Sequence, residues 1–418
     1  MFKKVFLLFA CVLVVHVKIA AQDTAYAREV ISALCSPEMA GRGYVNDGDA
    51  AAADYIKKQF EKLGLEAFDF NYYQDFSFPV NTFPGRVNLL VDGVKMKPGV
   101  DFIINPKSST YKGKFDVLTL DSLAWDSLMR NPVVQDGMMG FSKLPVSNSR
   151  EFNQKAEELS QKIFPAMLWR KERLTWSVAT ATDQSLEIDI VDSCLKTPPK
   201  LVEIDFETKF KKVHRTQNVV SYVRGTAQPD SFLVFTAHYD HLGIMGKEAL
   251  FPGANDNASG VSMLLQLAKY FEANKAGYSI AFIAFAGEEA GLKGSEFYVR
   301  HPIFPLMQIK CLVNLDLLGT GEEGITVVNA TEFPKLFAKM EKINIEKEYV
   351  TQVKKRGKAA NSDHHHFTEK GVPSFFIYTL GGIKAYHDVF DKPETLPLTE
   401  YADVFRLIRD FALRVMGI

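Results

Sequence analysis

The sequence of 418 residues predicts an α/β protein: a three-layer sandwich with a mostly parallel central sheet, plus an inserted β-rich domain. Two observations predict this class. In the second half of the chain, short continuous apolar runs alternate with amphipathic helical patterns, as in a buried parallel sheet that is covered by helices. Between residues 86 and 199, short β-like runs replace this alternation.

The first 21 residues are typical of a cleaved secretory signal. The basic pair Lys3-Lys4 precedes an apolar run from Val5 to Val15, and the small residues Ala20 and Ala21 follow it. The run is shorter than the ~20 apolar residues that a transmembrane helix needs. We therefore expect a secreted or periplasmic protein with no stable membrane span after cleavage.

Residues 22–85 form the first part of the main domain. A helical pattern at about 27–34 is followed by a glycine-rich loop at 37–49. A second helix then covers about 51–63, where apolar side chains recur at helical spacing, and Gly64 ends it.

Residues 86–199 form the inserted domain. Its β-like runs include Phe102 to Ile104 and Phe115 to Leu120, and a polar helix is expected around Asn153 to Lys162. Histidines and paired carboxylates are not concentrated in this stretch, so we expect the chemistry to lie elsewhere.

Residues 200–418 form the second part of the main domain. Its predicted strands are Asn218–Val223, Phe232–Thr236, Ser279–Phe285, Leu312–Leu315 and Ser374–Tyr378. Its clearest helices are Ser259–Phe271, with Ser259 as the expected N-cap, and Tyr401–Val415.

The charge balance argues against one class of partner. The formal net charge is -1, so no global positive field favours nucleic acid or an anionic membrane. We expect a peptide or protein substrate and no nucleic acid.

Polar residues follow the predicted strands of the last half at the points where those strands end. They are His238 and Asp240, Glu288 and Glu289, Asp316, and His387 in the loop after the last strand. In open α/β sheets the ligand crevice lies outside the carboxyl ends of the strands. Four separate strands therefore deliver polar groups to the same edge of the sheet.

The residue types suit a metal site. The spacing of His238 and Asp240 suits an imidazole ligand whose other nitrogen is fixed by a carboxylate. Asp256, in a tight polar loop, could bridge two cations with its two oxygens. Because Glu288 and Glu289 are adjacent, one could bind metal while the other stays free as a base.

Each of these residues taken alone has a commoner structural role, such as a hydrogen-bonded histidine, a surface acidic pair or a turn cap. Their joint occurrence at strand ends in an apolar context favours a metal centre instead. The predicted ligands are His238, Asp256, Glu289, Asp316 and His387.

Five segments of this half resemble the M28 family of zinc aminopeptidases and carboxypeptidases. They are Ala237–His241, Gly253–Gly260, Gly287–Ser295, Asn314–Asp316 and Tyr386–Asp388, and the stretch Ser36–Gly43 resembles the opening of that family. The resemblance covers roughly residues 25–75 and 210–415, and it implies a zinc exopeptidase-like fold. Many members of that family carry a protease-associated domain where residues 86–199 lie, so the inserted domain resembles such a domain in its placement.

The resemblance also implies two Zn²⁺ ions and a role for each residue. One zinc would bind His238, Asp256 and Asp316, and the other would bind Asp256, Glu289 and His387. Glu288 matches the general base, and a water that bridges the metals would be the nucleophile. Asp240 matches the carboxylate behind the first histidine ligand, and Tyr386 matches a tyrosine that steadies the oxyanion. The expected activity is release of N-terminal residues from peptides.

Three alternatives stay open. A carboxypeptidase of the same family would use the same metal site with the opposite polarity. A glutaminyl-cyclase-like acyltransferase would share the fold and use one zinc. A non-catalytic binding protein on a peptidase scaffold would have no reason to keep Glu288 beside Glu289.

Overall fold

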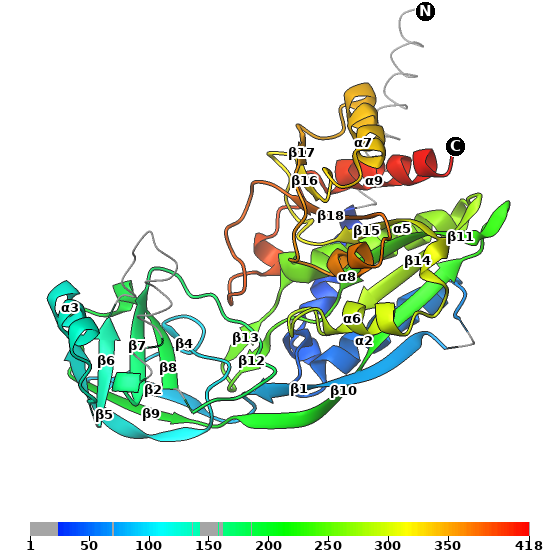
Figure 1. Cartoon of the computed structure of the whole chain (residues 1–418). Coiled ribbons are helices and arrows are strands. Elements are labelled where there is room, and N and C mark those ends of the chain that lie inside the picture. The colour runs from blue at the N-terminus through cyan, green and yellow to red at the C-terminus, as the bar shows by residue number, and fades with distance from the viewer. Residues whose placement is uncertain are drawn as a thin grey trace, which may run out of the picture.

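The computed structural model describes residues 24–68, 71–135, 137–142, 158, 162–184 and 186–417. The predicted signal and most of the polar helix expected around Asn153 to Lys162 lie outside these residues. Two lobes are visible, each built on an eight-stranded sheet (Figure 1). None of the described helices has both the length and the apolar character needed to cross a membrane.

The first sheet has four parallel strands at its centre, is joined to the outer strands on each side by an antiparallel pairing, and ends in the parallel pair of its last two strands. Its strand order is β1 (Tyr73–Thr82), β10 (Lys209–Val223), β14 (Tyr278–Phe285), β11 (Gln228–His238), β15 (Ile309–Leu315), β18 (Ser374–Thr379), β16 (Ile325–Val328) and β17 (Val353–Lys355). The four strands from β14 to β18 are mutually parallel, whereas β10 runs antiparallel to both β1 and β14.

Helices cover both faces of this sheet, as the sequence predicts. One face carries a helix over residues 24–34, α2 (Gly48–Leu63), α5 (Gly260–Ala273), α7 (Pro334–Lys347) and α9 (Tyr401–Val415), and the other carries α6 (Lys293–Arg300) and α8 (His364–Glu369). Successive side chains of a strand point to opposite faces. In β14, for example, Phe282 packs with the first set of helices and Ile283 with the second. The prediction of a three-layer α/β sandwich is confirmed.

The start of α5 differs from the expectation in one detail. Ser259 does not cap the helix, because its hydroxyl donates to the carbonyl oxygen of Asn255 at 2.7 Å. The side chain of Asn257 accepts the Gly260 N–H at 2.9 Å instead. The polar loop before α5 is therefore tied together by its own side chains.

The second sheet lies in the other lobe. Its order is β3 (Val94–Lys95), β2 (Val87–Val91), β9 (Leu201–Phe206), β5 (Tyr111–Thr119), β6 (Met138–Ser142), β7 (Ala166–Lys171), β8 (Leu186–Val191) and β4 (Phe102–Ile104). The helix α3 (Ser122–Arg130) follows β5. Because β9 pairs within this sheet, we propose that the inserted domain extends past residue 199 to residue 206.

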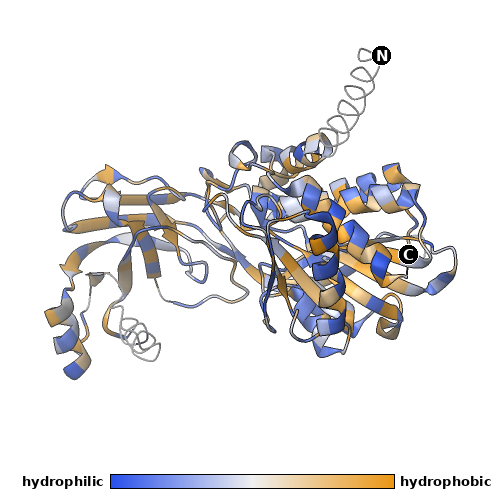
Figure 2. Ribbon diagram, turned by 90° about the horizontal axis from the view of Figure 1, so that it is seen from above, coloured by the Kyte–Doolittle hydropathy of each residue, from blue (hydrophilic) through white to orange (hydrophobic). Residues whose placement is uncertain are grey.

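An apolar seam joins the two lobes. The hairpin of β12 (Gly243–Met245) and β13 (Ala249–Phe251) follows β11 in the chain, yet its Met245 and Phe251 belong to the core of the second sheet. Trp176 of the second lobe stacks on Phe251 with ring centroids 4.7 Å apart. Figure 2 shows apolar residues along the strands of both lobes. Five short helical segments connect the larger elements: η1 (Pro37–Arg42), η2 (Asp192–Cys194), η3 (Ala254–Ser259), η4 (Leu306–Gln308) and η5 (Pro393–Thr395).

Candidate metal centre

The predicted site residues meet at the carboxyl ends of the parallel strands. His238 is the last residue of β11, Asp316 directly follows β15, and Glu288 and Glu289 follow β14. His387 lies in the loop after β18. These side chains line a cavity of about 160 Å³ whose walls are His238, Asp256, Glu288, Glu289, Asp316, Leu317, Arg356, Asn361, Phe376, Tyr378, Tyr386 and His387.

Asp256 lies between the two histidines. Its Oδ1 is 3.4 Å from Nε2 of His238, and its Oδ2 is 3.0 Å from Nε2 of His387. One carboxylate therefore presents one oxygen to each imidazole. This is the arrangement that a bridging ligand between two cations requires.

A further carboxylate lies beside each histidine, so that each histidine belongs to a group of three residues. Nε2 of His238 is 3.5 Å from Oδ1 of Asp316, and Nε2 of His387 is 3.2 Å from Oε2 of Glu289. The two triads share only Asp256. Their members are the residues of the two ligand sets that the resemblance implies.

Two neighbours offer further ligand atoms. Glu288 groups with His238 and Asp316, and His241 groups with Asp256 and Glu289, with one ligand atom from each residue within 4.8 Å of the others. His241 Nδ1 is 2.8 Å from Oε1 of Glu289, so it acts as a hydrogen-bond partner of that carboxylate. The buried Nε2 of His241 has no hydrogen-bond partner among the described residues.

Asp240 has a different set of contacts from the one that the sequence suggested. Nδ1 of His238 lies 3.1 Å from the backbone carbonyl oxygen of Asp240 and 3.9 Å from its carboxylate. The carboxylate instead accepts the backbone N–H groups of Glu288 at 3.1 Å and Glu289 at 3.3 Å, and the Tyr44 hydroxyl at 2.6 Å. Asp240 therefore holds the Glu288–Glu289 turn in place, while its main chain orients His238.

Arg42 holds the segment that leads to Asp256. Its side chain is fully buried and donates to five backbone carbonyl oxygens. The acceptors are Leu34, Tyr239, Pro252, Gly253 and Asp256, at distances from 2.6 to 3.2 Å. A planar guanidinium with five N–H donors can join several chain segments in this way.

Asp391 supports the same segment from the other side. Its carboxylate accepts the backbone N–H groups of Asn255 and Asp256 at 2.9–3.0 Å. Burial raises the pKa of Asp391 to about 7. The backbone of the bridging residue is thus fixed by two buried charged side chains from distant parts of the chain.

Burial and mutual charge set the electrostatics of the centre. Burial raises the pKa of Glu288 well above its ordinary value, and the carboxylates of Asp363 and Glu289 act in the same direction. Burial opposes ionisation of His387 as well, but Glu289 and Asp256 outweigh it and raise the pKa of His387 to about 11. The cluster thus holds a large excess of carboxylates that attract positive charge.

The residues present fit a pair of divalent cations. Carboxylate oxygens and imidazole nitrogens are ligands that zinc accepts, and a buried carboxylate oxygen without a partner is costly. Oδ1 of Asp316 is such an atom, because it is buried, has no hydrogen-bond partner among the described residues and lies 3.5 Å from Nε2 of His238. Its other oxygen accepts the Ser362 hydroxyl at 3.2 Å, which leaves Oδ1 free to face the centre.

Tyr386 lies beside the second histidine. Its ring stacks on that of His387 with centroids 4.0 Å apart, and it is 42% exposed at the mouth of the cavity. Burial raises its pKa, so the phenol stays protonated at neutral pH. A protonated phenol in this position can donate a hydrogen bond to a bound substrate.

Several residues of the site carry no signal in the sequence. Trp176 reaches it from far away in the chain and Asp391 follows the Tyr386–Asp388 motif by three residues, and no periodicity or spacing marks either of them. Arg42 lies within the quoted stretch Ser36–Gly43, so that motif could have pointed to it. Tyr44 and His241 lie within or beside the quoted motifs, so the motif positions could have pointed to them.

Comparison with known proteins relates part of the chain to a peptidase family. Residues 218–412, a little under half of the chain, match the model of peptidase family M28. A probable zinc metalloprotease of Pyricularia oryzae is 38% identical to this chain over 114 residues, which are 26% of the chain and 23% of that relative. Aminopeptidase YwaD of Bacillus subtilis is 33% identical over 170 residues, 38% of the chain and 34% of the relative.

The curated relatives are thus matched over about a quarter to a third of their length. Solved structures cover this chain more fully. BSAP, a zinc aminopeptidase from Bacillus subtilis, superimposes with a TM-score of 0.69 at 20% identity, and the match covers 93% of this chain and 94% of that one. At this identity the likeness concerns the fold, and it includes both lobes.

Proposed function

We propose that this chain is a two-zinc metallopeptidase that releases N-terminal residues from peptides. One observation carries the proposal: the two oxygens of Asp256 face His238 and His387, and each histidine has a second carboxylate beside it. The names of the relatives, a zinc metalloprotease and an aminopeptidase, support the metal and the activity. The export signal expected at residues 1–21 would place the activity outside the cytoplasm.

The two triads would each hold one ion, with Asp256 shared. When bound there, zinc would polarise the scissile carbonyl and lower the pKa of a coordinated water. His238 is held for this role by the Asp240 carbonyl oxygen, and Glu289 is held by His241.

Glu288 would act as the general base. It lies beside the first triad and lines the cavity. The two oxygens of Asp256 face His238 and His387 and not Glu288. Its backbone N–H is fixed by Asp240, so the carboxylate stays directed at the cavity. Burial raises its pKa well above the ordinary value of a glutamate, which makes its carboxylate a stronger base toward water.

Tyr386 would stabilise the negative charge that develops on the carbonyl oxygen. It lines the cavity beside His387, and its raised pKa keeps the hydroxyl proton available. Donors that are in position before the reaction need no reorganisation when charge develops.

One feature favours the opposite polarity. Arg356 lines the cavity, where its Nη1 donates to the Tyr378 hydroxyl at 3.3 Å. A guanidinium is the usual partner of a carboxylate. A carboxypeptidase would use Arg356 to bind the free carboxylate of its substrate, whereas an aminopeptidase has no such need for it.

The test is hydrolysis of matched peptides followed by mass spectrometry. Free, N-acetylated and C-amidated forms of one peptide are incubated with the zinc-loaded protein, with and without a chelator. Loss of single N-terminal residues that is blocked by acetylation and by the chelator is the expected result.

The other outcomes separate the alternatives. Cleavage blocked by C-amidation, and weakened in Arg356→Ala, would identify a carboxypeptidase. Cyclisation of an N-terminal glutamine with one equivalent of zinc would identify the acyltransferase. No reaction by a folded protein with two bound zinc ions would overturn the peptidase proposal.

A further inference from the structure

A segment of the second lobe contacts the loop that carries His387. This segment, Glu172 to Trp176, directly follows β7. The backbone N–H of Trp176 donates to the His387 carbonyl oxygen at 2.9 Å, and the carbonyl oxygen of Trp176 lies 3.0 Å from Nδ1 of His387. Trp176 of the second lobe is therefore hydrogen-bonded to both the backbone and the ring of His387.

The second of these contacts decides which nitrogen of His387 can bind metal. A carbonyl oxygen only accepts hydrogen bonds, so Nδ1 must carry the hydrogen. The lone pair is then on Nε2, the atom that faces Asp256 and Glu289. Such a contact to the outer nitrogen sets both the tautomer and the orientation of a ligand histidine.

The backbone of His387 needs this support. Its φ is 53°, in the left-handed region that residues other than glycine seldom adopt. Residues persist in this region when surrounding contacts over-determine them. The two hydrogen bonds between His387 and Trp176 supply such contacts.

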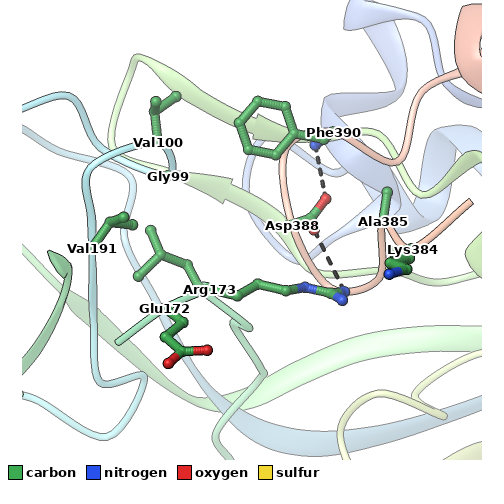
Figure 3. A pocket seen from close by; sticks show the side chains of 10 residues that line it. Gly99, Val100, Glu172, Arg173, Val191, Lys384, Ala385, Asp388 and Phe390 are labelled. Atoms are coloured by element: carbon green, nitrogen blue, oxygen red, sulfur yellow. Dashed lines mark hydrogen bonds and ion pairs between the residues drawn. The ribbon is translucent and has the colours of Figure 1, made fainter. Parts of the chain in front are cut away.

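Arg173 makes a second connection to the same loop. Its Nη2 donates to the Tyr386 carbonyl oxygen at 3.3 Å and lies 3.7 Å from the Asp388 carboxylate. Figure 3 shows Arg173 reaching toward Asp388, which in turn accepts the Phe390 N–H. A cavity of about 450 Å³ lies between other parts of the loop and the second lobe, and Val389 of the loop packs in the apolar core of that lobe.

Trp176 is itself anchored in the second lobe. Its indole N–H donates to the carbonyl oxygen of Ile104 in β4 at 2.9 Å. Its ring packs on Phe251 and, edge to face, on Phe83 at 5.6 Å. The position of His387 therefore depends on where the second sheet places Trp176.

The other metal triad has no such dependence. The Nδ1 partner of His238 is the carbonyl oxygen of Asp240, only two residues away. Asp316 is held by Ser362, and both belong to the first lobe. The two triads thus differ in which lobe supports them.

We propose that the segment Glu172–Trp176 positions His387, so that the inserted lobe controls occupancy of the second zinc site and leaves the first site unaffected. This proposal rests on the proposed function, because it takes the two triads to be zinc sites. Trp176 and Arg173 are positioning residues, since they act through His387 and its loop.

The test measures the zinc affinity of each site. The metal-free protein is titrated with zinc against a chelating indicator, and His238→Ala and His387→Ala assign the two affinities to their sites. The test variants are Trp176→Ala and Arg173→Ala. The control is Arg170→Ala, which removes an ion pair to Asp192 within the second lobe and leaves the loop contacts intact.

We expect both test variants to weaken the second site by about 10–100-fold while the first site keeps its affinity. Arg173→Lys should recover part of the loss, because it keeps a cation near Asp388. Arg170→Ala should change neither site.

Three results would overturn the positioning role: no change in either affinity, equal weakening of both sites, or the same loss in the control. If Trp176→Ala does not fold, Arg173→Ala and Trp176→Phe carry the test; the latter removes the indole N–H and part of the ring but keeps an aromatic side chain. Failure of the proposed function is distinguishable, because the unmodified protein would then not bind two zinc ions.

Discussion

The two sheets of this chain are similar in topology and different in what they carry. Each contains four adjacent parallel strands, β14-β11-β15-β18 in the first and β5-β6-β7-β8 in the second. At the carboxyl ends of the first set, His238 and Asp256 are 1% and 4% exposed. At the ends of the second, the ion pair of Arg170 with Asp192 keeps 34% and 27% of its side-chain surface exposed.

The difference shows that the carboxyl ends of parallel strands are not sufficient to form a cluster of buried charged groups. At the first edge, loops with buried anchors such as Arg42 and Asp391 cover the polar groups, and their burial makes the charges interact strongly. At the second edge, water screens the charges of Arg170 and Asp192. The second lobe contributes in another way, by sending Trp176 and Arg173 to the first lobe's site.

The sharpest test of the first edge is removal of its base. Glu288→Gln should keep zinc and lower kcat by about 10²–10⁴-fold, because it removes proton transfer without removing a ligand. Steady-state kinetics and metal analysis measure the two effects. In the matched variant Asp256→Asn, zinc content should fall instead; unchanged zinc there would remove Asp256 from the bridging role.

A pair of arginines compares the energetics of the two edges. Arg42→Ala leaves up to five buried carbonyl oxygens without their donor and should lower the free energy of unfolding by about 3 kcal/mol or more. Denaturant unfolding of the metal-free protein measures the change. A loss below about 1 kcal/mol would mean that water replaces the guanidinium at this position.

The buried side chain of His364, in the first lobe, should make the free energy of unfolding depend on pH. Burial lowers the pKa of His364 from 6.5 to about 3, so in acid the unfolded chain takes up a proton that the folded chain refuses. Stability should therefore fall as the pH drops from 6.5 toward 3, by about 1.4 kcal/mol per pH unit for this group.

The variant His364→Phe should lose this part of the slope. Unfolding is followed with a chelator present, so that proton release from metal ligands does not contribute. His301→Phe, at an exposed position, is the control and should keep the slope. Identical slopes in all three proteins would show that His364 titrates normally.

The smallest effect is expected at the second edge. Arg170→Ala removes a partly exposed ion pair and should change the free energy of unfolding by about 0.2–1 kcal/mol. The same denaturant experiment measures it beside Arg42→Ala. A loss as large as that of Arg42→Ala would contradict the distinction between the two edges.

Strands with continuous apolar runs were predictable from the sequence. The predicted runs at 232–236, 279–285, 312–315 and 374–378 all lie inside observed strands of the first sheet. By contrast, only residues 218–223 of β10 were predicted, although the strand begins at Lys209. Its first half, like β1, lies in an antiparallel ribbon whose side chains are often exposed, so it lacks the apolar signal.

By itself, the sequence determined the fold class and which residue types follow which strands, because local periodicity reports which face of an element is buried. Only the tertiary structure decided which atoms meet. It directs the Asp240 carboxylate to the backbone of Glu288 and Glu289, and it brings Trp176 to His387 across 211 positions in the sequence. Such contacts depend on how distant segments pack together, and a local sequence pattern does not specify which distant segments meet.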